Sequence, residues 1–317
     1  MGQALCKLLT SYNGILYSIF SGDRFKRSLT RRNGIKLALS GLCMGCLRAS
    51  ESTASAKQVP EMTRSIPPRA PQALTGSQFA ESVSNMDRQQ REHAILGQLL
   101  EGNLPSFLRK LVPLKLSYEL ASGKTCAAMT FVMPEYLAIG SDHDFLRIPM
   151  NLHTATAVAD RFGFVLPTKK IVDAIYDQST GRFTPQPLPA GPQMISTEYY
   201  RTHNTMIDQQ SQANGFHLGP LVSGHKKDVV ITNRLAKRPG QLAIYGWHRG
   251  KGAPIQPLST VHGAGYADYS HGIRLVASMA MIEGRLRSVY DILRDSVLAN
   301  VLSDEGTIRL APAFGNV

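Results

Sequence analysis

Cysteine is scarce in this sequence, and its few positions are unevenly distributed. The chain of 317 residues holds four cysteines, of which Cys6, Cys43 and Cys46 lie near the start, so residues 57–317 contain only Cys126. A single thiol excludes an internal disulfide and a cysteine-rich zinc site from that part of the chain. The same part also lacks a run of about 20 apolar residues, the length that spans a bilayer. We therefore expect residues 57–317 to form a soluble product that is held together by its core.

Several sequence signatures of catalysis are also missing. There is no Gly-x-Ser-x-Gly, no His-Glu-x-x-His and no His-x-His pattern. These absences exclude the usual nucleophile elbow of serine hydrolases and the helical zinc motif of many peptidases. The glycines at 246, 250 and 252 are not followed by Gly-Lys-Ser/Thr, so they do not form a phosphate-binding loop.

Acidic residues are fewer than basic ones, 23 against 35, and the net charge is +12. Residues 1–56 carry eight Lys/Arg and two Asp/Glu, which leaves 27 basic and 21 acidic residues for the remainder. That remainder is mildly basic and has no basic stripe, so we expect no nucleic-acid partner. A surface of this kind suits contact with anionic envelope polymers.

The N-terminal segment has the features of an export signal. Thr30 to Lys36 read Thr-Arg-Arg-Asn-Gly-Ile-Lys, residues 35–47 are apolar or small apart from Lys36, and Ala54 and Ala56 form an Ala-x-Ala site. The stretch resembles a twin-arginine export signal, although Gly34 stands where that pattern usually has Phe. The resemblance implies an export signal over residues 1–56, contact with the export machinery, and a periplasmic or secreted product. The alternative is a basic N-terminal arm with a short buried helix.

The rest of the chain reads as an α+β protein with an antiparallel sheet in its C-terminal half and helices on one side. Residues 57–74 are Pro-rich and predict a disordered linker, and residues 75–317 then form a single domain. Periodicity and caps predict helices over 75–101, 154–163, 168–178, 196–214 and 288–302. Strands are predicted over 111–118, 127–139, 229–232, 241–248, 253–258 and 266–282, with a turn at Glu283-Gly284.

Residues 225–274 contain most of the groups that could act on a substrate. Antiparallel strands joined by short turns would bring their polar ends together at one rim of the sheet. The candidate catalytic residues there are His225, His248, His262, Asp268 and His271. The candidate substrate-binding residues are Lys227, Asp228, Trp247, Arg249, Tyr266, Tyr269, Ser270 and Arg274.

Strand geometry places a condition on this cluster. On a straight strand Asp268 and His271 point to opposite faces, so they can meet only where the chain bends. We expect the bend at Gly272, since glycine can adopt a positive φ.

Three chemistries fit these residues. The first is a catalytic metal such as zinc on His262 and Asp268, completed by another histidine and open to water. The spacing Ser259…His262…Gly265…Asp268 resembles the zinc D-alanyl peptidases of the cell wall, but one residue fewer separates His262 from Asp268 and no histidine follows His271.

The second chemistry is metal-free, with a His–Asp pair as general base and Ser270, Ser223 or Cys126 as nucleophile. The third is a lyase on an anionic polysaccharide, in which Arg249, Lys227 or Arg274 would neutralise a carboxylate. The leading hypothesis is an exported hydrolase of an envelope or extracellular polymer, with peptidoglycan peptides as the first candidate substrate. The expected partner is such a polymer or a small-molecule substrate. The alternative from another class is a non-catalytic envelope-binding or scaffold protein, in which the histidines lie apart and bind backbone groups.

Overall fold

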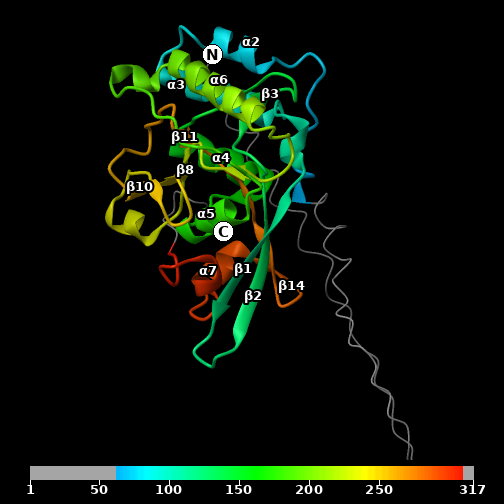
Figure 1. The fold of residues 1–317 in the computed structure, drawn as a ribbon, viewed down its shortest axis with the longest axis vertical. Coiled ribbons are helices and arrows are strands. Elements are labelled where there is room, and N and C mark those ends of the chain that lie inside the picture. The colour runs from blue at the N-terminus through cyan, green and yellow to red at the C-terminus, as the bar shows by residue number, and fades with distance from the viewer. Residues whose placement is uncertain (1–61, 310–317) are drawn as a thin grey trace, which may run out of the picture. The chain divides into compact units, whose positions relative to one another are not determined.

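The computed structural model describes residues 62–309. The export signal predicted over residues 1–56 lies outside the described residues. The described part is an α+β fold with two main sheets, several helices and mostly antiparallel pairing, as the sequence predicted. Figure 1 shows helices α2, α3 and α6 at one end of the molecule and the long β1–β2 hairpin at the other.

The larger sheet joins strands from both halves of the chain. Its strands run in the order β14-β13-β2-β12-β5, and β1 pairs with β2. The bounds are Val112–Glu119 for β1, Thr125–Val132 for β2, Phe164–Val165 for β5, Val276–Ala277 for β12, Met279–Ile282 for β13 and Arg285–Ser288 for β14. β12 and β13 pair antiparallel with β2. Strands near the C-terminus therefore complete the sheet that begins with the β1–β2 hairpin.

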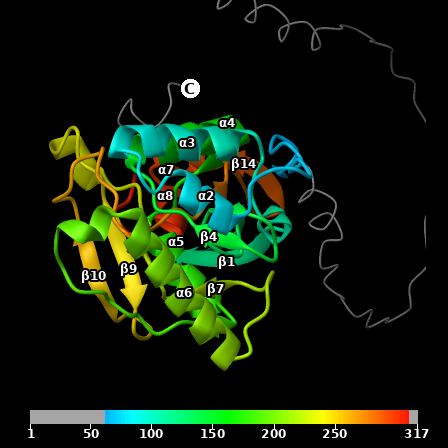
Figure 2. The ribbon, with the colours of Figure 1, turned by 90° about the horizontal axis from the view of Figure 1, so that it is seen from above.

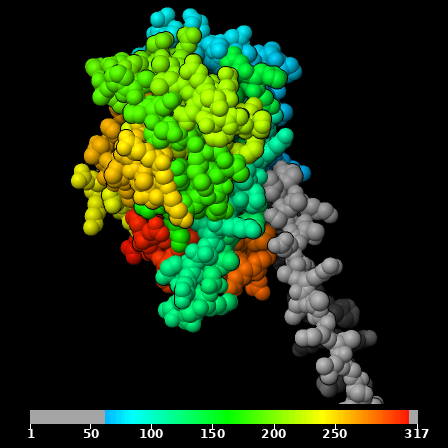
Figure 3. Space-filling model, viewed as in Figure 1, coloured from blue at the N-terminus to red at the C-terminus, as the bar shows by residue number. Residues whose placement is uncertain are grey.

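The smaller sheet, in the order β10-β9-β8-β11, carries the candidate site. Its strands are β8 (Lys227–Val229), β9 (Ile244–His248), β10 (Pro254–Ser259) and β11 (His271–Gly272). β11 pairs with β8 in parallel, which sets His271 beside Lys227. Figure 3 shows the β9–β10 hairpin, in yellow and orange, at the outer surface on the left of the view. Two further pairs of short strands are β3 (Ala138–Gly140) with β4 (Phe145–Arg147) and β6 (Gly181–Arg182) with β7 (Val222–Ser223).

Helices begin at the capping residues that the sequence offers. Thr168, Ser196 and Ser288 each accept a hydrogen bond from a backbone N–H in the first turn, as predicted from their types. The bounds are α2 (Gly76–Ser82), α3 (Arg88–Leu100), α4 (Leu152–Phe162), α5 (Lys169–Gln178), α6 (Thr197–Ala213), α7 (Val289–Arg294) and α8 (Ala299–Leu302). Short 3-10 helices lie at Ser106–Arg109, Pro192–Ile195 and Asn233–Lys237.

Helix α5 connects the two sheets. It contacts β1 of the larger sheet and β9 of the smaller one, and its apolar face buries Ile171, Val172 and Ile175. Seen from above in Figure 2, α3 and α4 lie side by side, and α6 lies between β9 and β7. The candidate site is thus attached to the core through short strands and one central helix.

Three predicted elements differ from the structure. The helix predicted over 75–101 is two helices, because Asp87 caps α3 with a full capping box. The helix predicted over 288–302 is α7 and α8, interrupted where Asp295 accepts hydrogen bonds from Val297 and Leu298. The strand predicted over 266–282 is instead a turn followed by β11, β12 and β13.

Residues 62–74, the described part of the predicted linker, lie against the fold. Ile66 is 4% exposed and belongs to the core. Arg109 donates hydrogen bonds to the carbonyls of Ile66 and Pro67, and Arg69 donates to Asn103. This stretch is therefore packed, because its backbone carbonyls serve as acceptors for two arginines.

Candidate functional site

Three of the five predicted catalytic residues lie together. One ligand atom each of His262, Asp268 and His271 lies within 4.8 Å of the others. His262 is partly exposed in the loop after β10, whereas Asp268 and His271 are buried. These three residues are called the His–Asp–His trio below.

The bend that brings Asp268 and His271 together is made by Asp268 itself. Its Oδ1 accepts the backbone N–H of Ser270 at 2.8 Å and the Ser270 hydroxyl at 2.6 Å. The N–H of His271 donates to the Asp268 carbonyl at 3.0 Å, which closes the turn. The prediction that Gly272 would make the bend with a positive φ is wrong, since its φ is not in that region.

Aromatic and imidazole rings surround the trio. The ring of His262 stacks on Tyr266, with centroids 4.3 Å apart, and the Tyr266 hydroxyl donates to Asp268 Oδ2 at 3.1 Å. His271 meets the Tyr266 ring edge-on at 5.7 Å. Tyr266 and Ser270 thus use both oxygens of Asp268 and fix the carboxylate in place.

His271 is the least satisfied side chain of the trio. Its exposed fraction is 0%, yet neither ring nitrogen has a hydrogen-bond partner. Nε2 lies 3.8 Å from Asp268 Oδ2, which is too far for a hydrogen bond. A buried polar atom without a partner costs about 1–3 kcal/mol of stability. A ligand that bonds to either nitrogen would remove this cost.

Electrostatics keep the trio in metal-binding form at neutral pH. Burial lowers the pKa of His271, and Lys227 and His262 lower it further against the opposing charge of Asp268. Burial and Lys227 likewise lower the pKa of His262. Burial acts to raise the pKa of Asp268, but His271 and the Ser270 hydrogen bonds outweigh it and the pKa falls. Two neutral imidazoles and one carboxylate result.

Lys227 and Trp247 form the wall next to the trio. The Lys227 ammonium lies 5.3 Å from the centre of the Trp247 ring. Trp247 has a φ of 54° and follows Gly246 at 110°, so the end of β9 is bulged. A left-handed backbone is uncommon for a bulky residue, and here it aims the indole beneath Lys227.

His225 and His248 are not part of the trio. His225 Nε2 lies 2.7 Å from Glu135, and His248 Nε2 lies 3.1 Å from Asp173 on α5. Each ring is also packed against aromatic side chains. The structure therefore does not bring these two histidines together with the trio, because carboxylates from other segments hold them.

Several predicted substrate-binding residues have structural partners. Asp228 accepts the hydroxyl of Tyr136 at 2.8 Å. Arg274 donates to the carbonyls of Met133 and Val222. Tyr269 is buried and its hydroxyl contacts the backbone of Leu188. These side chains are too buried to meet a substrate. Arg249 is exposed near the β9–β10 turn.

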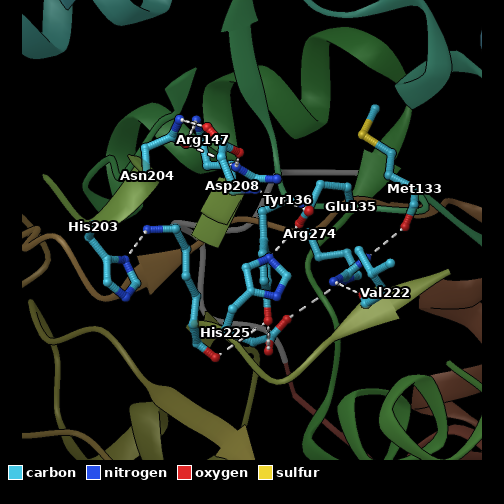
Figure 4. Close-up of polar contacts among 12 residues, drawn as sticks. Met133, Glu135, Tyr136, Arg147, His203, Asn204, Asp208, Val222, His225 and Arg274 are labelled. Carbon is cyan, nitrogen blue, oxygen red and sulfur yellow. Dashed lines mark hydrogen bonds and ion pairs between the residues drawn. The ribbon is translucent and has the colours of Figure 1, made fainter. Parts of the chain in front are cut away.

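Sequence reasoning missed a buried polar network, which Figure 4 shows in close-up. Glu135 accepts Arg147 Nε at 3.1 Å and contacts His225, and Arg147 Nη1 donates to Asp208 at 2.7 Å. Burial acts to raise the pKa of Glu135, but His225 and Arg147 bring it well below its ordinary value. The only signal was a charged residue, Glu135, inside an otherwise apolar run.

The comparisons with known proteins add no relative. The chain matches no family model, and no curated protein or solved structure is significantly similar to it. Within residues 62–309 no helix is both long and apolar enough to cross a membrane.

Proposed function

We propose that this protein is a metal-dependent hydrolase whose metal ion is bound by His262, Asp268 and His271. Two imidazoles and a carboxylate are a ligand set that zinc uses in catalytic sites, where an open position holds water. Bound zinc would supply a water of lowered pKa as nucleophile. The observation that carries the proposal is the buried His271 ring, whose two nitrogens have no partner although a carboxylate and a second imidazole lie beside them.

The geometry favours the metal over a metal-free base. In a metal-free His–Asp pair the carboxylate would orient the imidazole through a hydrogen bond, but His271 Nε2 lies 3.8 Å from Asp268 Oδ2, which is too far for one. The Ser270 hydroxyl is buried and donates to Asp268, which makes it a positioning group. Burial raises the pKa of the Cys126 thiol, so it is a poor nucleophile.

The chain's own residues would orient the ligands. Tyr266 and the Ser270 backbone hold Asp268, and the stacked Tyr266 ring holds His262 near the surface. His262 is the trio member that solvent reaches, so substrate would enter from its side. The export signal predicted over residues 1–56 supports an envelope or extracellular polymer as substrate, with peptidoglycan peptides as the first choice.

Metal binding tests the proposal directly. Protein dialysed against a chelator and titrated with Zn²⁺ in a calorimeter should bind one ion per chain, and purified peptidoglycan fragments should be cleaved only by the loaded protein. His271→Ala should weaken zinc binding at least tenfold, and His271→Gln provides a second variant of similar size. His153→Ala, which changes an exposed histidine on α4, is the control. Equal zinc affinity in wild type and in both His271 variants would reject the site.

A further inference from the structure

Backbone pairing fixes Lys227 beside the trio. Its N–H donates to the Ser270 carbonyl at 2.8 Å, and its Cα is the register partner of His271 in the parallel β8–β11 pair. The charge of Lys227 acts on all three members, since it lowers the pKa of His262, Asp268 and His271. Lys227 is therefore part of the same site although it is no metal ligand.

The Lys227 ammonium has no anionic partner within residues 62–309. It forms no ion pair or side-chain hydrogen bond there, and it lies over the face of the Trp247 ring. Burial lowers its pKa while the nearby Asp268 opposes this. Asp268 directs its own oxygens to Ser270 and Tyr266. Lys227 is partly exposed and its ammonium is not among the fully buried polar atoms without a partner, so its three donors are open to a ligand from solvent.

Trp247 holds this ammonium in place. Trp247 is 4% exposed, and its left-handed backbone costs about 1–3 kcal/mol and persists only where the surroundings enforce it. Such strain is concentrated at functional sites. The Lys227 ammonium therefore lies against the Trp247 ring, and Lys227 is paired with His271 of the trio.

We infer that Lys227 binds a carboxylate of the substrate, so that the bond to be cleaved lies next to a free carboxylate group. This inference rests on the proposed function and names its substrate class. A single ammonium close to the negative Asp268 matches one negative charge. Phosphate sites more often gather bidentate guanidinium groups or several backbone N–H groups, but a lysine also binds phosphate as a point charge, so phosphate is a separate arm of the test. A peptide with a free C-terminus or a uronic acid carries the required carboxylate.

The fluorescence of Trp247 provides a direct test. Trp247 is the only tryptophan of the chain and lies against Lys227, so its emission reports ligands at this position. N-acetylglycine serves as the carboxylate probe, N-acetylglycinamide as its neutral counterpart, and inorganic phosphate as the dianion, all at constant ionic strength. Each is titrated into the chelator-treated protein and into the zinc-loaded protein.

The expected result is a saturable emission change with N-acetylglycine and none with the amide. Lys227→Gln should weaken the carboxylate affinity at least tenfold and Lys227→Arg less, whereas the exposed control Lys115→Gln should bind as wild type does. His271→Ala should lose zinc but keep the carboxylate response of the chelator-treated protein, so the two proposals fail separately. No saturable response in wild type, an unaltered Lys227→Gln response, or tighter binding of the amide or phosphate would overturn the inference.

Discussion

At Gly272 the backbone of β11 lies directly against the side chain of Tyr136. A Cβ added there would lie 2.6 Å from two ring carbons of Tyr136 and 3.0 Å from Lys226 Cβ. Tyr136 cannot retreat, because its hydroxyl is bonded to Asp228 and the Arg274 guanidinium lies 4.3 Å above its ring. The sequence indicated glycine here for a bend, but the structure requires it for this close approach.

Replacing Gly272 with alanine should therefore destabilise the protein through overpacking. We expect Gly272→Ala to lower the free energy of unfolding by about 1–3 kcal/mol, as measured by urea denaturation. Gly250→Ala is the matched control, since nothing lies within 4 Å of a Cβ there and its φ is not in the left-handed region. Equal stability of the two variants would show that the Tyr136 contact is not rigid.

At the scale of elements, local signals predicted local structure. Helices α4, α5 and α6 begin and end near the predicted residues because Thr168, Ser196 and Gly163 act within their own turns. The run 266–282 was misread because Asp268 competes with strand pairing by binding the Ser270 backbone. His262, Asp268 and His271 were predictable from residue type and proximity in sequence. The partners of His225 and His248 were not, because Glu135 and Asp173 lie 90 and 75 positions away.

The network around Glu135 joins four segments, and removing its charge should be costly. Glu135→Gln leaves Arg147 with only the partly exposed Asp208 as a carboxylate partner. Breaking one partner of a buried ion pair typically costs about 3–5 kcal/mol, and urea unfolding should report a loss of that size. Glu81→Gln removes an exposed partner of Arg201 and should change nothing measurable. A Glu135→Gln protein as stable as wild type would mean that the network relaxes around neutral groups.

At the scale of the whole molecule, hydrophobic pattern and composition predicted the α+β class correctly, yet the sheet that pairs β2 with β12 and β13 links residues more than 140 positions apart. Only packing of the complete core selects such pairs, because β12 and β13 are short and apolar. The core also buries several ionisable side chains whose burial could not be predicted from residue type alone.

Two of these buried groups make the fold sensitive to acid. Burial lowers the pKa of His225 to about 4 from its ordinary 6.5, and it also lowers the pKa of His203. Between pH 6.5 and pH 4 both imidazoles are protonated in the unfolded chain but not in the folded chain. The free energy of unfolding therefore falls as the pH drops from 6.5 towards 4. Each such imidazole contributes a slope of about 1.4 kcal/mol per pH unit near pH 5. Urea unfolding in the presence of chelator at pH 7, 6, 5 and 4 measures the total slope, and His225→Gln should reduce it by about 1.4 kcal/mol per pH unit. A flat profile for the wild type would show that both imidazoles are already protonated inside the fold.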